Sequence, residues 1–167
     1  MLGMELFEAI RHILIQSHGR ISCFYRNMSE EDLLKILSRR DICIVSDGVA
    51  YNLNSYNGYP HPRDTGSTPR GLRLIRENKL MPMEDAIYKI TRLPATLMGF
   101  GDQFGTLEVG KDATITVFDW DTITDCATFE QPTLPSKGID FVVVNGELVL
   151  DHGTFTGKLP GRLLLRK

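Results

Sequence analysis

The residues of this chain with the clearest potential for chemistry follow a short apolar run over residues 42–45. The run ends abruptly at Ser46-Asp47-Gly48, so a carboxylate stands where the apolar segment stops. Four consecutive apolar residues between polar ones are typical of a parallel strand that is buried on both faces. Because α/β folds keep their chemistry at the carboxyl ends of such strands, Asp47 is a candidate functional residue. An Asp-Gly pair is also ordinary turn chemistry, and these residues alone leave both interpretations open.

Two further candidates, His61 and Arg63, belong to a long polar and aromatic segment that leaves directly from Asp47, residues 48–70. Loops of this length inside compact domains are usually functional or mobile. Arg63 carries a guanidinium that binds carboxylates through two parallel hydrogen bonds, or else it fixes the loop by donating to backbone carbonyls. His61 precedes a proline and is expected in extended backbone, where it either packs within the loop or contacts a ligand.

Helices and short strands must position these residues. Apolar residues recur at helical spacing over residues 4–16, and Gly19 helps to end that helix. Ser29 begins a second helix, because serine is a good cap and the acidic residues after it suit the positive end of the helix dipole. Short strands are expected at residues 21–25 and 42–45. The order helix, strand, helix, strand is typical of parallel α/β winding.

The second part of the chain changes from helical to all-β character at about residue 100. Helices are expected over residues 71–78 and 83–91, and apolar residues then alternate over residues 113–118, which predicts a strand. Asn145-Gly146 stands between two apolar runs and tolerates the positive φ angles of a two-residue turn, which predicts a β-hairpin. The fold class indicated is therefore α/β over residues 1–100 and all-β over residues 101–167.

Composition places the chain among globular proteins and excludes some partners. Its 167 residues are 42% hydrophobic and 24% charged, with a net charge of -2, which gives no attraction to nucleic acid or to an anionic membrane. No apolar stretch approaches the length of a membrane helix, and the first residues lack the pattern of a signal peptide. Cys23, Cys43 and Cys126 lack a Cys-x-x-Cys spacing and are expected to be reduced, buried thiols of a cytoplasmic protein.

Several motifs together carry a family resemblance. Residues 105–119 show the pattern Gly-x-Leu-x-x-Gly-Lys-x-Ala-x-x-x-Val-Phe-Asp, and residues 143–146 read Val-Val-Asn-Gly. These are similar to the C-terminal β-sandwich segment of the amidohydrolase superfamily. Asn27-Met28-Ser29-Glu30-Glu31-Asp32, Ser46-Asp47-Gly48, His61-Pro62-Arg63, Leu93-Pro94-Ala95 and the closing residues 157–162 resemble, in type and order, the D-aminoacylases (N-acyl-D-amino-acid deacylases). As a set these motifs are specific, whereas each one alone is weak.

The resemblance implies that the chain is the last part of a TIM-type (β/α)8 barrel followed by a small β-sandwich segment. The strands at residues 21–25 and 42–45 would be the seventh and eighth of that barrel. The implied reaction is zinc-dependent hydrolysis of the amide bond of N-acyl-D-amino acids, with Asp47 taking a proton beside the metal and returning it to the leaving amine. Arg63 would bind the free carboxylate of the substrate and His61 would contact it. Tyr51, Tyr56 and Tyr59 are candidates to line an acyl pocket.

The metal ligands of that family have no counterpart here. The four histidines, His12, His18, His61 and His152, show no ligand spacing, and a catalytic zinc normally takes three protein ligands. We therefore expect zinc in the complete enzyme but none held by this chain, which alone is expected to be inactive. Unpaired strands favour the missing N-terminal barrel part as a partner, self-association, or rearrangement into a non-barrel α+β core. Two alternatives stay open: a non-catalytic interaction module, and a fragment of a dihydroorotase-like cyclic amidase.

Overall fold

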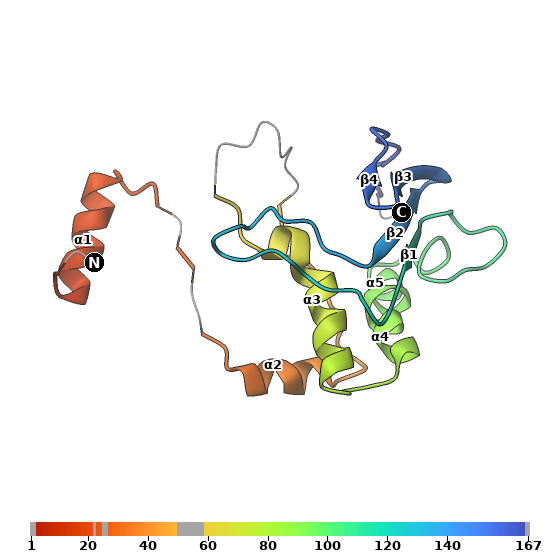
Figure 1. The fold of residues 1–167 in the computed structure, drawn as a ribbon, viewed down its shortest axis with the longest axis horizontal. Coiled ribbons are helices and arrows are strands. Elements are labelled where there is room, and N and C mark those ends of the chain that lie inside the picture. Colours follow the sequence, from red (N-terminus) through yellow and green to blue (C-terminus); the bar gives the residue numbers. More distant parts are fainter. Residues whose placement is uncertain (1–2, 22, 25–26, 50–58, 166–167) are drawn as a thin grey trace.

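The computed structural model describes residues 3–21, 23–24, 27–49 and 59–165, in which helices come first and strands follow (Figure 1). The helices are α1 (Leu6–Gln16), α2 (Glu30–Leu37), α3 (Arg63–Glu77), α4 (Met83–Ile90) and α5 (Arg92–Leu97). The strands are β1 (Ile115–Phe118), β2 (Ile139–Val144), β3 (Glu147–Asp151) and β4 (Thr154–Phe155). The strands form a single antiparallel sheet in the order β1-β2-β3-β4.

Helix α1 forms where the apolar spacing predicts it, yet its apolar face is exposed. The helix ends at Gln16, and Gly19 helps to end it as expected, with a φ of +74° and an N–H that donates to the carbonyl of Leu14 at 2.8 Å. In Figure 1 α1 lies apart from the other elements, and it packs on none of the other described helices or strands. Phe7, for example, is 85% exposed. The amphipathic pattern therefore predicted the helix correctly, but the apolar face of α1 packs against no other helix or strand of the described residues.

The core lies where α2, α3 and α4 meet. It contains Leu37, Leu72, Leu74, Ile75, Ala86 and Ile123, which are all buried. Helix α2 begins at Ser29 as predicted, with the Ser29 hydroxyl accepting from the N–H of Asp32 at 3.1 Å. At the end of α2, the carbonyl of Leu37 accepts a hydrogen bond from the buried ammonium of Lys89 in α4. Burial lowers the pKa of Lys89, so this contact joins two helices with a costly but satisfied polar group.

Helix α3 begins eight residues before the predicted start and runs through Pro69, which corrects the expectation of a loop up to residue 70. A proline inside a helix leaves the carbonyl four residues earlier without its N–H partner. Here that carbonyl belongs to Thr65, and it accepts from the hydroxyl of Ser136 at 3.2 Å. The prediction of a loop was wrong because Ser136, far along the chain, supplies the hydrogen bond that the proline cannot donate.

Neither of the two predicted barrel strands forms among the residues that the structure describes, and residues 22 and 25 of the first lie outside them. Residues 42–45 are extended but pair with no strand among the described residues, and residues 21, 23 and 24 are likewise outside any strand. Instead, the N–H of Ile44 donates to the carbonyl of Lys89 at 3.2 Å, and the Ile44 side chain packs on Gly71 of α3. A parallel strand buried on both faces needs a strand on each side, and the described chain supplies neither. The parallel α/β assignment for residues 1–100 is therefore not realised as a sheet.

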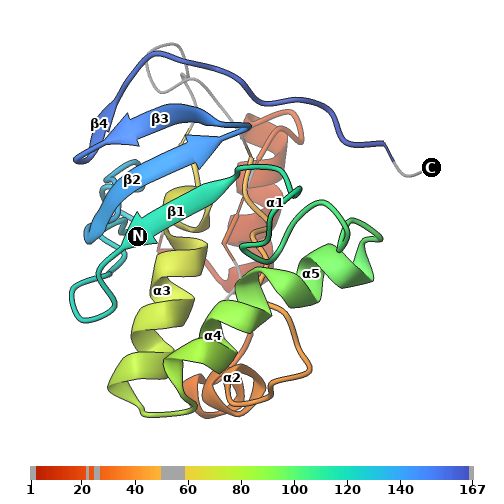
Figure 2. The same ribbon diagram turned by 90° about the vertical axis from the view of Figure 1, so that its right-hand side faces the viewer.

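The antiparallel sheet confirms the predicted hairpin. Val144 pairs with Glu147, and the two residues between them, Asn145 and Gly146, have φ angles of +49° and +80°. Those values fit the two-residue turn that the sequence indicated. A second turn of the same kind, which the sequence reading did not identify as a hairpin, joins β3 to β4 at His152-Gly153. Figure 2 shows the resulting meander beside α3, α4 and α5.

A groove of about 680 Å³ separates the sheet from the helices. Apolar side chains from α3, α4, β1 and β2 line most of it, among them Leu72, Ile90, Ile115 and Val142.

No helix in the described ranges is long and apolar enough to cross a membrane. The three cysteines are free, as expected, but Cys23 is exposed and Cys43 and Cys126 are only half-buried, so the expectation of buried thiols was wrong.

Candidate functional site

The Ser46-Asp47-Gly48 corner lies against the first turn of α3, which brings Asp47 to Arg63. The carboxylate oxygen Oδ2 of Asp47 lies 3.0 Å from Nη2 of Arg63. Just after the corner, the N–H of Val49 donates to Oδ1 of Asp64 at 3.1 Å. Two residues that the sequence proposed separately therefore form an ion pair. The Asp47 side chain is 88% exposed, so this carboxylate is accessible to solvent in the described structure.

Gly48 permits the close approach of the corner to α3. A Cβ atom at this position would lie 2.9 Å from the Cα of Asp64 and 2.6 Å from the hydroxyl oxygen of Ser46. The first contact is with helix backbone, which cannot move aside without shifting the turn that carries Arg63. The sequence indicated a sharp turn and a close backbone approach at Gly48, and the structure shows that the backbone approached is that of α3.

His61 is held by one hydrogen bond and two aromatic rings. Its Nδ1 accepts from the backbone N–H of Arg63 at 3.0 Å. The rings of Phe24 and Phe129 contact the imidazole edge-on, with centroid distances of 5.0 and 5.3 Å. Burial is the largest cause that lowers the pKa of His61, and the charge of Arg63 adds to it. His61 therefore packs within the loop, as one of the two sequence interpretations held, and it lies beside Arg63 and Asp47.

Phe129 is the residue near this site that sequence reasoning missed. It belongs to the connection between β1 and β2, residues 119–138, which we call the β1–β2 connection. In Figure 1 this segment leaves the sheet, runs along α3 toward the N-terminal end of that helix and returns. The hydroxyl of Tyr59 donates to the carbonyl of Phe129, so Tyr59 supports the site through this contact. Tyr51 and Tyr56 lie outside the described residues. No local signal distinguishes Phe129 from any other aromatic residue in a loop.

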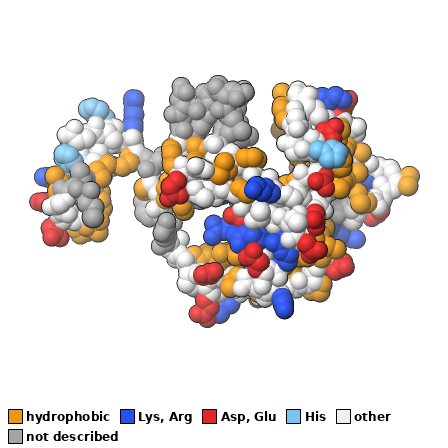
Figure 3. All heavy atoms as spheres, in the orientation of Figure 1, with side chains coloured by type: hydrophobic (Ala, Val, Ile, Leu, Met, Phe, Trp, Pro, Cys, Tyr) orange, Lys and Arg blue, Asp and Glu red, His pale blue; other side chains and the backbone are white. Residues whose placement is uncertain are grey.

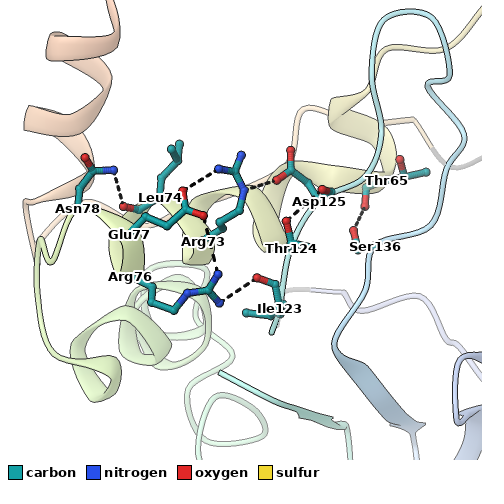
Figure 4. A network of polar contacts seen from close by, with 10 residues as sticks. All are labelled: Thr65, Arg73, Leu74, Arg76, Glu77, Asn78, Ile123, Thr124, Asp125 and Ser136. Carbon is teal, nitrogen blue, oxygen red and sulfur yellow. Dashed lines mark hydrogen bonds and ion pairs between the residues drawn. The ribbon is translucent and has the colours of Figure 1, made fainter. Parts of the chain in front are cut away.

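Polar contacts hold the β1–β2 connection on α3 (Figure 4). Arg73 of α3 pairs through Nε with Oδ1 of Asp125 at 2.8 Å, where the two side chains are 26% and 12% exposed. That pairing raises the pKa of Arg73. The guanidinium of Arg76 donates to the carbonyl of Ile123 at 3.0 Å. At the other end of the connection, Ser136 contacts Thr65 as described above. These bonds hold both the outgoing part of the connection, at residues 123 and 125, and the returning part, at residue 136, against the helix.

The surface around these contacts is mixed in charge. Figure 3 shows basic and acidic side chains side by side over the middle of the face that carries α3. Arg73 forms ion pairs with two carboxylates, through Nε with Oδ1 of Asp125 at 2.8 Å and through Nη1 with Oε2 of Glu77 at 2.9 Å. On this face the charges of neighbouring side chains therefore offset one another in pairs.

The donor side chains of the described residues do not form a metal cage. No group of three or more His, Cys, Asp or Glu side chains gathers closely enough to hold a metal ion in the part of the chain that the structure describes. Asp47 contributes one carboxylate, and His61 faces aromatic rings and a backbone N–H. Zinc therefore does not fit this chain's described residues as a site of their own.

Comparison with known proteins identifies a matching family model and several similar proteins. Residues 31–150 match the model of the amidohydrolase family. The chain is 40% identical over 143 residues to the N-acyl-D-glutamate deacylase of Alcaligenes xylosoxydans xylosoxydans, which is 85% of this chain and 28% of that protein.

Solved structures give the same result in three dimensions. A D-aminoacylase mutant in complex with CuCl2 matches with a TM-score of 0.73 and 39% identity, over 83% of this chain and 28% of that one. An N-acyl-D-glutamate deacylase from Bordetella bronchiseptica, complexed with zinc and a phosphonate inhibitor, matches with a TM-score of 0.65 and 41% identity, over 73% of this chain and 25% of that one. The chain thus spans less than a third of the length of these relatives.

Proposed function

The chain belongs to the amidohydrolase family, whose model matches residues 31–150, and we propose that it supplies the C-terminal part of a zinc-dependent N-acyl-D-amino-acid deacylase. The observation that carries this proposal is the identity with a named deacylase over 85% of the chain. Under this proposal, residues 1–100 complete a barrel and residues 101–167 belong to its β-sandwich. A cyclic amidase is less well supported, because the relatives compared above are deacylases.

Asp47 is the proposed proton-transfer group. In amide hydrolysis, water attacks the acyl carbon, and Asp47 takes a proton from that water. The carboxyl group then gives the proton to the amide nitrogen as the C–N bond breaks, which releases a carboxylate and a D-amino acid. An exposed carboxylate suits this work, because it must be charged to accept the proton and must reach the substrate. The pairing with Arg63 keeps it oriented while no substrate is present.

Arg63 is the proposed binding group for the free carboxylate of the substrate. Its planar guanidinium matches a carboxylate with two parallel hydrogen bonds, and among the described residues Asp47 pairs with it through Nη2. The side chain is 45% exposed and therefore open to a ligand. Asp47 lies against the first turn of α3, which carries Arg63, so a substrate held by Arg63 would have its amide bond near Asp47.

The proposed partner is the remaining part of an amidohydrolase barrel. The chain spans 28% of the deacylase that it matches, and it exposes Ile42 and Val45 of the extended segment together with the apolar face of α1. Val45, at the end of the extended segment, is 66% exposed, which is unusual for a residue of an apolar run. We propose that the zinc of the complete enzyme is held by that remaining part, since the described residues offer no cage for it.

A chimeric enzyme tests the proposed function. The segment of the Alcaligenes deacylase that this chain matches would be replaced by the chain, and release of D-glutamate from N-acetyl-D-glutamate would be measured. We expect hydrolysis of the D-substrate by the chimera and none by the chain alone. A chimera that folds and binds zinc but does not hydrolyse the substrate would contradict the proposal and favour the non-catalytic interaction module.

Replacing Arg63 with glutamine in this chimera should raise KM about 10- to 100-fold with little change in kcat. A hydrogen bond to a charged group contributes roughly 1.5–3 kcal/mol, and a loss of uniform binding appears in KM. The matched control is Arg40→Gln, because Arg40 also forms an exposed ion pair, with Asp85 at 2.6 Å. An unchanged KM for Arg63→Gln would show that this side chain only orders the loop.

A further inference from the structure

The hydrogen bond at His61 determines which nitrogen of its ring carries a proton. A backbone N–H can only donate, so Nδ1 of His61 must accept from the N–H of Arg63 with its lone pair. In the neutral ring the proton is then on Nε2. No side chain or backbone group in the described ranges receives a hydrogen bond from that Nε2–H. The ring therefore has one occupied acceptor and one donor that is available to a ligand.

The surroundings of the ring keep it neutral. Phe24 and Phe129 cover it with aromatic edges and faces, which removes water from a charged imidazolium. Arg63 and Arg70 of α3 oppose a positive charge, whereas Asp64 of α3 and Asp47 of the corner favour it. Burial and the arginines prevail, and the pKa of His61 lies below its ordinary value. The lowered pKa favours the neutral ring, and the hydrogen bond from the N–H of Arg63 orients it.

The β1–β2 connection supplies half of this aromatic environment. Phe129 also contacts Phe24, with ring centroids 5.1 Å apart, so the three rings support one another. The connection reaches this point because Asp125 pairs with Arg73 and because the hydroxyl of Thr65 donates to the carbonyl of Pro132 at 3.1 Å. The β part of the chain therefore contributes directly to the site at the start of α3.

We propose that His61 is a neutral hydrogen-bond donor that presents Nε2–H to the substrate carboxylate bound by Arg63, and that Phe129 is the positioning residue for its ring. This inference rests on the proposed function. The imidazole and the guanidinium leave the same turn, and the hydrogen bond from the Arg63 N–H fixes the ring relative to that turn. A neutral Nε2–H donates to an oxygen but cannot take a proton there, which leaves proton transfer to Asp47.

The state of His61 can be measured on the chain itself by NMR with ¹⁵N-labelled histidine. We expect the His61 signals, assigned with His61→Gln, to show Nε2 protonated and Nδ1 unprotonated, and to titrate below the ordinary histidine value. Phe129→Ala should shift this titration upward by exposing the ring to water, and Phe129→Tyr should restore it. The matched control is Phe141→Ala, because Phe141 contacts His152 with ring centroids 4.5 Å apart and should leave His61 unchanged.

Each outcome of this experiment decides a separate point. A proton on Nδ1 of His61, or a titration that Phe129→Ala leaves unchanged, would overturn the inference and leave the proposed function intact. The wild-type measurement needs no variant, so it stands even where Phe129→Ala fails to fold. Addition of N-acetyl-D-glutamate to the chimeric enzyme, labelled with ¹⁵N at both histidine and arginine, is expected to shift the signals of both Arg63 and His61 Nε2–H. A shift at Arg63 alone would overturn the donor role, whereas no shift at either residue would count against the proposed substrate class.

Discussion

Asp47→Asn is expected to reduce hydrolysis of N-acetyl-D-glutamate by the chimeric enzyme about 10²- to 10⁴-fold in kcat, the usual contribution of a positioned acid–base group. The carboxamide has the shape of the carboxylate but neither takes the proton from water nor returns it to the leaving nitrogen. Loss of the ion pair with Arg63 should cost little stability, since the Asp47 side chain is 88% exposed and surface pairs contribute only about 0–1 kcal/mol. The effect is therefore expected in kcat and not in the amount of folded protein.

Asp41→Asn provides the control for this variant. Asp41 stands six residues earlier and forms a comparable exposed ion pair with Arg39 at 2.5 Å, but it lies away from the first turn of α3. Initial rates at saturating substrate for the two variants separate the loss of a general acid–base group from the loss of a surface charge. Equal activities for Asp47→Asn and Asp41→Asn would remove Asp47 from the reaction.

Gly138→Ala is expected to lower the free energy of unfolding by about 2–5 kcal/mol, through backbone strain of about 1–2 kcal/mol and overpacking of about 1–3 kcal/mol. Gly138 has a φ of +82°, and a Cβ atom there would lie 2.6 Å from the backbone nitrogen of Ile123 and 2.7 Å from its Cα. Ile123 is 3% exposed and belongs to the core, so the backbone has no room to yield. The two ends of the β1–β2 connection also meet here, where the N–H of Asp119 donates to the carbonyl of Gly138 at 2.9 Å.

Gly153→Ala separates the two contributions to this loss. Gly153 has a similar φ of +76°, but nothing lies within 4 Å of the position that its Cβ would take. Urea unfolding of both variants should show the strain alone for Gly153→Ala and the strain together with the clash for Gly138→Ala. Equal losses in the two variants would mean that the β1–β2 connection moves freely from the core.

The correct parts of the sequence analysis depend on neighbouring residues. The cap at Ser29 and the two-residue turn at Asn145-Gly146 are determined within a few residues, and both form as predicted. The incorrect parts depend on partners elsewhere in the chain. Residues 42–45 have the composition of a buried strand, but a strand exists only where another strand pairs with it. Helix α3 passes through Pro69 because Ser136 satisfies the carbonyl of Thr65, and no pattern around Pro69 contains that information.

The candidate site divides in the same way. The sequence by itself determined the chemical types, because a carboxylate after an apolar run and an arginine and a histidine beside a proline are visible as letters. Only the tertiary structure brought Asp47 to Arg63, since that contact depends on a glycine that lets the corner approach α3. The tertiary structure also brought Phe129 into contact with His61. These residues are 68 positions apart, and nothing in the sequence indicates that they meet. Side-chain chemistry is a property of each residue, whereas hydrogen-bond direction, burial and protonation state depend on the residues that the fold brings around it.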